Sequence, residues 1–283
     1  MCRFIAYLGQ EVLAADLIIK PIHSLIYQSY NSLERFEPLN GDGFGMGWYT
    51  PSIDPLPCLY TTVSPAWADQ NLHRLASKVK TPCLFAHVRA ASAGLSVTEL
   101  NCHPFIYKRF LWMHNGSIDE FAKIKRRLRD TLRDELYNFI NGTTDSEHAF
   151  ALFLNQLASN HDTYTAAELA QAMLTTVRLI DQWTQEAGSK IPSHANFAVT
   201  DGEQIIATRY TSGNDLPETL YYTTGAKFEV DHCEARITPT SGHPHAVIIA
   251  SEPLTDRENW ISVRHNHMIT VNKRFEIELT PIR

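Results

Sequence analysis

The sequence lacks several features that define common protein classes. Its 283 residues include five cysteines, an odd number, and no C-x-x-C pair. This pattern disfavours a disulfide framework or a structural zinc site and favours free thiols in a reducing compartment. No apolar run approaches the roughly 20 residues of a membrane span, and the first nine residues are too short for a signal peptide. We therefore expect a cytoplasmic protein with no membrane contact.

Positive charge is also scarce. Twenty-five Lys and Arg residues face 31 Asp and Glu residues, which gives a formal net charge of −6. The one basic cluster, from Lys123 to Arg129, contains Ile124 and Leu128 at helical spacing, which is typical of a solvated helix face. The composition therefore predicts no nucleic-acid partner.

Nucleotide and metal motifs have the wrong spacing. The run Gly41–Gly47 alternates glycine with other residues and contains neither G-x-G-x-x-G nor G-K-[ST]. Alternating glycines let another backbone or a buried substrate approach one face of a strand, and both interpretations stay open. The pairs His243-x-His245 and His265-x-His267 have no third ligand at a familiar spacing. We expect no metal and no cofactor.

The expected secondary structure begins and ends with strands. β-Branched and aromatic stretches predict strands at Arg3–Leu8, Phe44–Tyr49, Leu59–Val63, Cys83–Arg89, Phe105–Met113, Asn196–Val199, Gln204–Arg209, Ala246–Ala250, Met268–Val271 and Phe275–Leu279. Helices are expected along Trp67, Leu72, Leu75 and Val79, and after capping boxes at Ser117, Thr144 and Thr165. This order indicates one α+β domain over residues 1–283, with antiparallel sheets covered by helices.

Cys2 is the most informative single residue. If Met1 is removed, Cys2 carries a thiol and a free α-amine, which titrate near about 8.5 and about 7.7–8.0. The neutral amine can take the thiol proton directly or through one water, so the residue would be a nucleophile with its own base. The alternative is a residue that follows Met1 without any catalytic role.

An oxyanion hole is a candidate role for Asn115 and Gly116. They lie in the segment His114-Asn115-Gly116 at the end of an apolar strand. A side-chain amide and a neighbouring backbone N–H can converge on one oxygen. The same dipeptide is also common in ordinary turns, so a turn is the alternative.

Charged candidates for substrate binding are Arg89 and Asp145. Arg89 ends a predicted strand, with Ser92 in the following loop. Its guanidinium can bind a substrate carboxylate, or it can form an ordinary surface salt bridge. Asp145 lies inside the capping box that starts at Thr144. Its carboxylate can interact favourably with the helix dipole, or it can bind a substrate ammonium group.

An internal cysteine is a further alternative nucleophile. Cys102 or Cys83 could act with a histidine base, but both lie in or beside strand patterns, whereas thiol hydrolases of that type place the cysteine at a helix start. His103 precedes Pro104 at a strand entrance, which is typical of a hydrogen-bonded structural residue.

Six segments in sequence order resemble the glutaminase domain of class II glutamine amidotransferases, which are N-terminal nucleophile hydrolases. They are Met1–Arg3, Asn40–Trp48, Ala86–Ser92, Asn101–Pro104, His114–Gly116 and Thr144–Glu147. The resemblance implies a four-layer αββα sandwich, in which two antiparallel sheets lie between helical layers.

The resemblance also implies a role for each matching residue. Cys2 would be the nucleophile, and Asn115 with Gly116 would form the oxyanion hole. Arg89, with Ser92 nearby, would bind the substrate α-carboxylate, and Asp145 would bind the α-ammonium group. Ala93 stands where many family members carry a histidine, although other members lack it too.

A closer resemblance extends along almost the whole chain. Segments Asn40–Tyr49, Ser64–Trp67, Asn101–Phe105, Asn196–Gly202 and Ser251–Leu254 resemble the amidotransferase-like subunit of the fungal glutathione-degradation complex. They are similar, less closely, to the YafJ group and to the γ-glutamyl hydrolase of ergothioneine synthesis.

The resemblance implies an amidase acting on the γ-glutamyl amide of glutamine or of a γ-glutamyl compound such as glutathione, through a thioester on Cys2. It also implies a peptidase-like or synthetase partner subunit. The alternatives are a catalytically silent binding subunit with the same fold and an ammonia-supplying glutaminase subunit of a separate synthetase.

Overall fold

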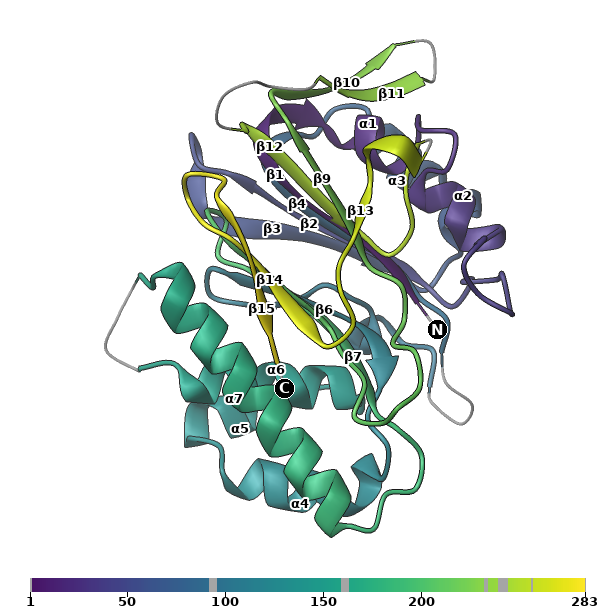
Figure 1. The fold of residues 1–283 in the computed structure, drawn as a ribbon. Helices are drawn as coiled ribbons and strands as arrows, with labels where there is room; N and C mark the ends of the chain where they lie inside the picture. Colours follow the sequence, from purple (N-terminus) through teal and green to yellow (C-terminus); the bar gives the residue numbers. More distant parts are fainter. Residues whose placement is uncertain are drawn as a thin grey trace.

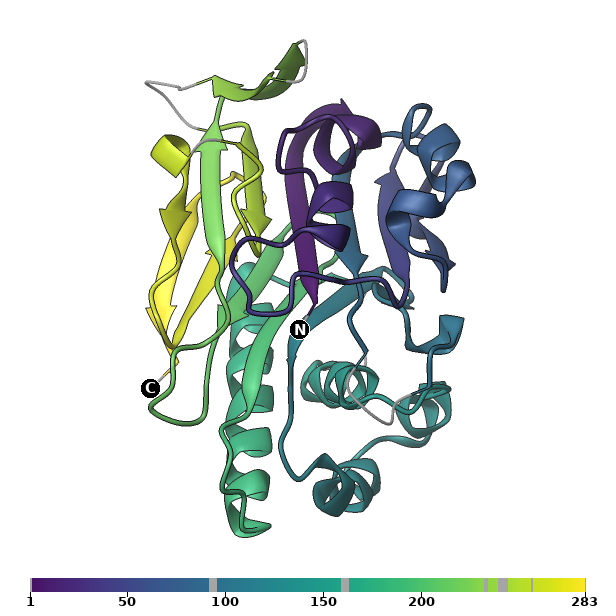
Figure 2. The same cartoon turned by 90° about the vertical axis from the view of Figure 1, so that its right-hand side faces the viewer.

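The fold consists of two stacked sheets between two layers of helices (Figures 1 and 2). The computed structural model describes residues 2–91, 96–158, 163–231, 234–238, 244–255 and 257–282. The pairings recorded between neighbouring strands are all antiparallel.

The first sheet has seven strands in the order β13-β9-β12-β1-β4-β2-β3. They are β1 (Arg3–Leu13), β2 (Phe44–Thr50), β3 (Asp54–Thr62), β4 (Lys80–Val88), β9 (Tyr221–Gly225), β12 (Ala246–Ala250) and β13 (Ile261–Ser262). Its outer face is covered by α1 (Ala14–Ile18), α2 (Leu25–Tyr30) and α3 (Gln70–Ala76). A separate hairpin pairs β10 (Lys227–Asp231) with β11 (Glu234–Thr238).

The second sheet has six strands in the order β15-β14-β8-β7-β6-β5. They are β5 (Phe105–Tyr107), β6 (Phe110–Ser117), β7 (His194–Thr200), β8 (Ile205–Arg209), β14 (His267–Val271) and β15 (Ile277–Pro281). The helices on this side are α4 (Phe121–Asp130), α5 (Asp134–Phe139), α6 (Asp145–Gln156) and α7 (Ala166–Glu186).

Strand β1 is buried on both faces. Phe4 and Leu8 pack in the apolar layer between the two sheets, whereas Ile5 and Tyr7 pack in the layer under the first helices. Successive side chains of a strand point to opposite faces, so a central strand between two covered faces needs apolar residues at both alternations. This explains why the sequence after Cys2 is almost continuously hydrophobic.

Two glycines of β2 allow close packing. A Cβ at Gly45 would lie 2.1 Å from the carbonyl oxygen of His103, and one at Gly47 would lie 2.7 Å from a methyl group of Leu111. Because Leu111 belongs to β6 of the second sheet, Gly47 lets the two sheets approach each other at this point. The close-packing interpretation of the glycine run is therefore confirmed for these two positions.

Several local predictions were wrong. The expected strand Phe105–Met113 is two strands, β5 and β6, joined by a turn in which Lys108 has a φ of 50°. Ser117 does not cap a helix, because it is the last residue of β6, and α4 begins at Phe121 without a side-chain cap. Trp67 lies in a short 3-10 turn before α3 and is partly exposed.

The other two helix starts follow the prediction in part. Thr165 and Glu168 form the complete capping box of α7. Thr144 accepts the Glu147 N–H at the start of α6, but the Glu147 carboxylate instead accepts the N–H groups of Asn141 (2.9 Å) and Gly142 (2.6 Å). Within the described ranges, no helix is both long and apolar enough to cross a bilayer.

Candidate active site

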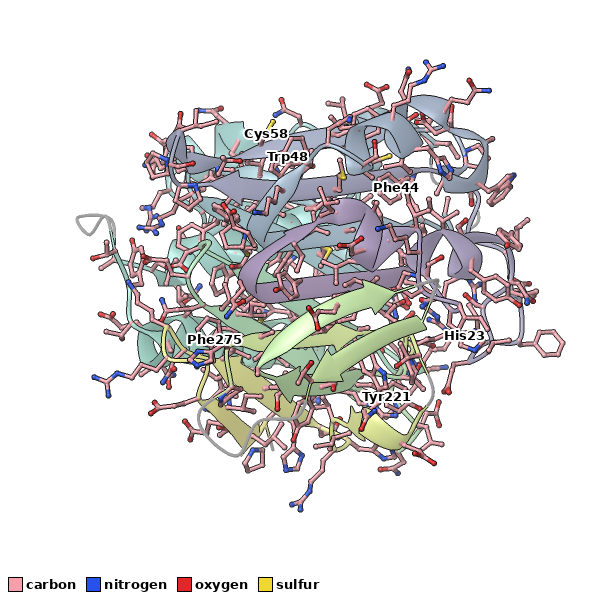
Figure 3. All side chains as sticks on the ribbon, turned by 90° about the horizontal axis from the view of Figure 1, so that it is seen from above. His23, Phe44, Trp48, Cys58, Tyr221 and Phe275 are labelled. Carbon is pink, nitrogen blue, oxygen red and sulfur yellow. The ribbon has the colours of Figure 1, made fainter. Side chains whose placement is uncertain are left out.

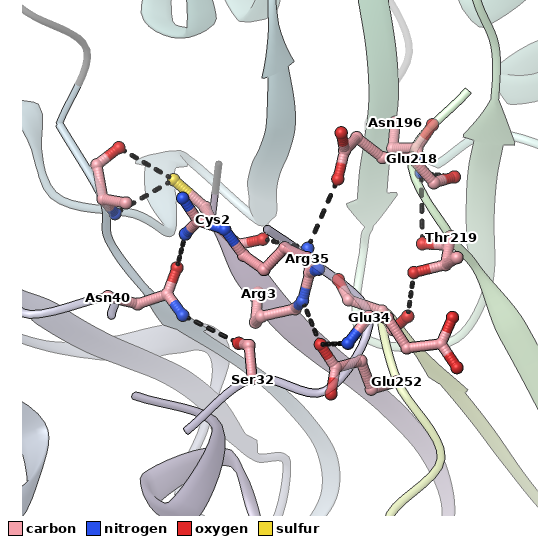
Figure 4. Close-up of polar contacts among 12 residues, drawn as sticks. Cys2, Arg3, Ser32, Glu34, Arg35, Asn40, Asn196, Glu218, Thr219 and Glu252 are labelled. Atoms are coloured by element: carbon pink, nitrogen blue, oxygen red, sulfur yellow. Dashed lines mark hydrogen bonds and ion pairs between the residues drawn. The ribbon is translucent and has the colours of Figure 1, made fainter. Parts of the chain in front are cut away.

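Cys2 lies at the start of β1, beside the end of β4. Arg3 pairs with Val88 in the antiparallel register, so Cys2 and Arg89 face each other one residue beyond that pair. The Ala90 N–H donates to the Cys2 Sγ at 3.4 Å, and the sulfur lies 3.6 Å from the Ala90 carbonyl oxygen (Figure 4). Burial raises the pKa of the Cys2 thiol, although the Ala90 hydrogen bond and the nearby Arg89 charge oppose this effect. The thiol is therefore protonated near neutral pH and needs a base.

A buried ion pair fixes the backbone at Cys2. Arg3 donates through Nη1 to the Cys2 carbonyl oxygen (2.9 Å) and pairs through Nε with Glu252 (2.6 Å). The side chains of Arg3 and Glu252 are 0% and 3% exposed. Glu252 also accepts the N–H groups of Leu33 (2.9 Å) and Glu34 (3.2 Å). One carboxylate therefore joins the start of β1 to the loop that follows α2 (Figure 4).

That loop places a second guanidinium near Cys2. The Arg35 side chain extends toward Cys2 and donates through Nη1 to Asn40 Oδ1 at 2.5 Å (Figure 4). Asn40 is buried and donates in turn to the Gln28 carbonyl oxygen (2.8 Å) and to Ser32 Oγ (2.9 Å). Sequence reasoning missed Arg35, because an arginine in a polar loop carries no local signal of burial.

Arg89 is a buried residue and not a surface salt-bridge partner. It is 3% exposed, and its Nη2 donates to the carbonyl oxygen of Ser96 at 3.2 Å. Its Nη1 is buried and has no hydrogen-bond partner in the described part of the chain. The surface salt-bridge interpretation was therefore wrong, and one donor of the fork is left for another acceptor. Ser92 lies outside the described residues.

Asn115 and Gly116 belong to β6 and not to a turn. They pair in register with Asn196 and Ala195 of β7, so the turn interpretation was wrong. Asn115 is fully buried, and neither its Oδ1 nor its Nδ2 has a partner among the residues described. A Cβ at Gly116, where φ is 155°, would lie 1.9 Å from the carbonyl oxygen of His194. Leaving a buried amide unpaired is costly, which suggests that it serves a ligand.

His87 connects the two halves of the site. It pairs in register with Phe4 on β1, and its Nε2 lies 3.2 Å from the carbonyl oxygen of His114 on β6. Because a carbonyl only accepts, His87 carries its proton on Nε2. Burial lowers the pKa of His87 to about 3, so the ring is neutral near pH 7. This bond brings the ends of β1 and β4, which carry Cys2 and Arg89, close to Asn115.

Asp145 is tied to the end of β6. Its Oδ2 accepts the Ile118 N–H (2.8 Å), and its Oδ1 accepts the Ser146 N–H (2.8 Å). Ser146 Oγ lies 2.9 Å from Nδ1 of His114, whose Nε2 lies 3.0 Å from the carbonyl oxygen of His194. Asp145 is also the first residue of α6, so its negative charge interacts favourably with the positive end of the helix dipole, as expected. These bonds set the carboxylate beside the strand end that carries Asn115 and Gly116.

The internal cysteines do not resemble nucleophiles. Burial raises the pKa of Cys83 to about 12 and that of Cys102 to about 11. Their recorded hydrogen-bond partners are oxygen atoms, namely Thr200 Oγ1 for Cys83 and the carbonyl oxygens of Thr62 and Thr98 for Cys102. An inert thiol is the expected state of such residues.

The histidine candidates differ in their settings. His103 is buried and stacks on His87 with ring centroids 4.3 Å apart, but neither of its ring nitrogens has a hydrogen-bond partner within the described chain. It is therefore not the hydrogen-bonded residue that the sequence suggested. His267 Nδ1 bonds the carbonyl oxygen of His265, and His243 lies outside the described residues. Where the chain is described, no group of three or more His, Cys, Asp or Glu residues could hold a metal ion.

Comparison with known proteins decides the family. The family model described as Glutamine amidotransferases class-II matches residues 19–280. The chain belongs to this family. It is therefore an enzyme of the type that hydrolyses an amide C–N bond, and its relatives act in γ-glutamyl amide chemistry.

Two curated relatives cover nearly the whole chain. The probable glutamine amidotransferase DUG3 of Saccharomyces cerevisiae is 41% identical, over 100% of this chain and 84% of that protein. The gamma-glutamyl-hercynylcysteine sulfoxide hydrolase of Mycobacterium tuberculosis is 32% identical, over 97% of this chain and 94% of that protein.

Solved structures share the fold. A glutamine aminotransferase class-II domain protein from Silicibacter pomeroyi matches with a TM-score of 0.68 over 99% of both chains, at 23% identity. The glutamine phosphoribosylpyrophosphate amidotransferase of Bacillus subtilis matches with a TM-score of 0.61, at 15% identity, over 100% of this chain and 49% of that one. The expected α+β fold of two antiparallel sheets between helices is confirmed.

Proposed function

We propose that this protein hydrolyses the γ-glutamyl amide bond of glutamine or of a γ-glutamyl compound such as glutathione, through a γ-glutamyl thioester on Cys2. The observation that supports the proposal is that three polar groups belong to strand ends linked by the His87–His114 hydrogen bond. They are the buried Cys2 thiol, together with Nη1 of Arg89 and the side-chain amide of Asn115, which have no hydrogen-bond partner among the described residues. Cys2 precedes the range that the family model matches, so its role depends on this geometry.

The reaction requires removal of Met1, which frees the α-amine of Cys2. That amine takes the thiol proton, and the sulfur forms a bond to the substrate side-chain carbonyl carbon. The Asn115 amide and the Gly116 N–H stabilise the resulting oxyanion. The C–N bond then breaks as the leaving nitrogen takes the proton from the Cys2 ammonium group. Water attacks the thioester, which releases glutamate and restores the thiol.

Two opposite charges would hold the amino-acid end of the substrate. The guanidinium of Arg89 binds the α-carboxylate, because a planar fork suits a carboxylate, and Ser92 stays a further candidate for this contact. Asp145 binds the α-ammonium group. Glutamine and glutathione share this end, so Arg89 and Asp145 alone do not distinguish between them.

The relatives support hydrolysis of a γ-glutamyl compound, because one of them is named for that activity. The name of the yeast relative, a probable glutamine amidotransferase, supports as a second candidate a glutaminase subunit that supplies ammonia to a separate synthetase. Both candidates allow a partner subunit, peptidase-like or synthetase. We further propose that residues 1–283 act as a single domain of this type. A cytoplasmic location stays a prediction.

The test is release of glutamate by wild type, Cys2→Ala and Cys58→Ala, with glutamine and with glutathione, alone and with a cell extract. Cys58 is a suitable control, because it is exposed on β3 (Figure 3). We expect Cys58→Ala to match wild type and Cys2→Ala to be inactive. A wild type inactive on both substrates in all conditions, or an active Cys2→Ala, would contradict the proposal. A retained Met1 in the intact mass would favour the catalytically silent subunit.

A further inference from the structure

A second concave site lies at the end of the sandwich opposite to Cys2. It is a cavity of about 400 Å³ between the start of β3, the β5–β6 turn, the start of α5 and the end of α6. This volume falls within the range typical of small-molecule pockets. Phe110 in its wall is five residues before Asn115 on β6, a distance of about 17 Å along an extended strand. A ligand bound here would therefore not occupy the candidate active site.

The floor of this cavity is apolar. Phe110, Leu154 and Leu157 line it and are themselves largely buried. The ring of Tyr164 lies 5.8 Å from that of Phe110, measured between centroids. Leu56, near the start of β3, adds an exposed apolar side chain to the rim. These groups provide a surface on which a flat or extended hydrocarbon can be removed from water.

The rim of the cavity is basic. Among the described residues that line it, the charged ones are Lys108, Arg109, Arg133 and Glu135, so bases outnumber acids there. Lys108 is exposed at the tip of the β5–β6 turn, where its Nζ lies 5.3 Å from the centre of the Tyr107 ring. The rim is therefore positively charged, although the whole chain has a formal net charge of −6.

The carboxylates near this rim are already engaged. Glu203 pairs with Arg109 at 3.4 Å and also with Lys273 at 2.6 Å. Glu135 lies 3.7 Å from Arg133. Arg133 also donates to the carbonyl oxygens at the end of α6, including that of Leu157 at 3.1 Å. For Lys108, the described residues contain no ion-pair partner.

We propose that this cavity binds a small amphipathic anion, namely an aryl or alkyl group that carries a carboxylate, sulfonate or phosphate. The hydrocarbon packs on Phe110 and Leu157, and the anionic head lies at the mouth within reach of Lys108 and Arg109. A neutral compound of the same shape keeps the apolar contacts and loses the charge-assisted hydrogen bonds, which are the stronger polar contacts. The site therefore selects for negative charge.

The probe is 2-naphthoate, with 2-naphthamide as its neutral counterpart, and binding is measured by isothermal titration calorimetry. Lys108→Gln removes the exposed charge, and Leu56→Ala shortens the exposed apolar side chain, so neither should unfold the protein. Lys78→Gln is a charge control, because Lys78 follows α3 on the helical layer of the first sheet. Melting temperatures confirm that each variant is folded.

We expect 2-naphthoate to bind wild type and Lys78→Gln equally, and 2-naphthamide to bind about fivefold to tenfold more weakly. Lys108→Gln should lose about the same factor for 2-naphthoate only, whereas Leu56→Ala should weaken both compounds. Cys2→Ala should bind 2-naphthoate as wild type does. Absence of binding to wild type at millimolar concentration, equal affinity for the two compounds, or an unchanged affinity in Lys108→Gln would each overturn the proposal.

Discussion

Replacing Glu252 by Gln tests whether the buried pair with Arg3 organises the candidate active site. The substitution keeps the shape of the side chain but removes its charge, while Arg3 stays buried and 0% exposed. The Glu252 carboxylate accepts hydrogen bonds from Arg3, Leu33 and Glu34 with its two oxygens. A Gln side chain has only one oxygen that can accept them. We expect loss of stability and loss of activity together.

The magnitude follows from the burial of both partners. Removing one partner of a buried ion pair costs about 3–5 kcal/mol, because the other charge loses its main compensation. Arg3 keeps a longer contact with Glu218 at 3.4 Å, so we expect the lower end of this range. At about 2–4 °C per kcal/mol for a large domain, the melting temperature should fall by about 6 °C or more. Since Arg3 also holds the Cys2 carbonyl oxygen at 2.9 Å, glutamate release should fall at temperatures where the variant is still folded.

The assay is thermal unfolding followed by circular dichroism, combined with glutamate release at a temperature below both transitions. Glu203→Gln is the matched control, because Glu203 is 50% exposed and pairs with Arg109 and Lys273 at the surface. Exposed pairs contribute about 0–1 kcal/mol, so this variant should melt within about 2–4 °C of wild type. If Glu252→Gln melts as high as Glu203→Gln and keeps full activity, the reasoning about the Arg3–Glu252 pair is refuted.

Three further predictions concern single residues of the site. Asn115→Ala should lower kcat by about 100-fold to 1000-fold, because an oxyanion-hole donor is typically worth about 2.7–4 kcal/mol; a kcat near that of wild type would contradict its role. Asp145→Asn should raise KM for glutamine by more than it lowers kcat, since the α-ammonium group is bound equally in the ground and transition states; an unchanged KM would count against that contact. Burial holds the pKa of His87 at about 3, whereas an unfolded histidine titrates near about 6.5. Between these pH values the unfolded chain binds a proton that the folded chain does not, so stability should fall as pH is lowered, by about 1–2 kcal/mol at pH 5 from this residue. Urea unfolding at pH 7 and pH 5 should show a smaller loss in His87→Gln, and an equal loss would refute the assignment.

The sequence predicted the parts of the fold that depend on local pattern. The strands around Phe44–Tyr49 and Ala246–Ala250 and the capping box at Thr165 are present, because alternation and end signals act within a few residues. Strand β9, Tyr221–Gly225, was not predicted, although its Tyr and Thr residues favour a strand; it pairs with β12 and β13. Ser117 followed by Glu120 has the spacing of a capping box, but the pairing of β6 with β7 extends the strand through Ser117.

The motifs named the candidate site residues but not the surroundings of those residues. Motifs pointed to Cys2, Arg89 and Asn115, but the burial of these residues depends on how distant strands meet. The same is true of the atoms of Arg89 and Asn115 that have no partner in the described part of the chain. Arg3 and Glu252 are 249 positions apart in the chain, so no local pattern could have paired them. The same holds for His87, whose bond to the carbonyl oxygen of His114 crosses from one sheet to the other.

The most direct measurement of the central claim is mass spectrometry of the protein mixed with a γ-glutamyl substrate and stopped rapidly in acid. The account predicts that the first peptide begins at Cys2 and that a fraction of it carries one γ-glutamyl group on the sulfur. A γ-glutamyl group found on Cys58, Cys83 or Cys102 instead, or a first peptide that retains Met1 in an active preparation, would contradict it.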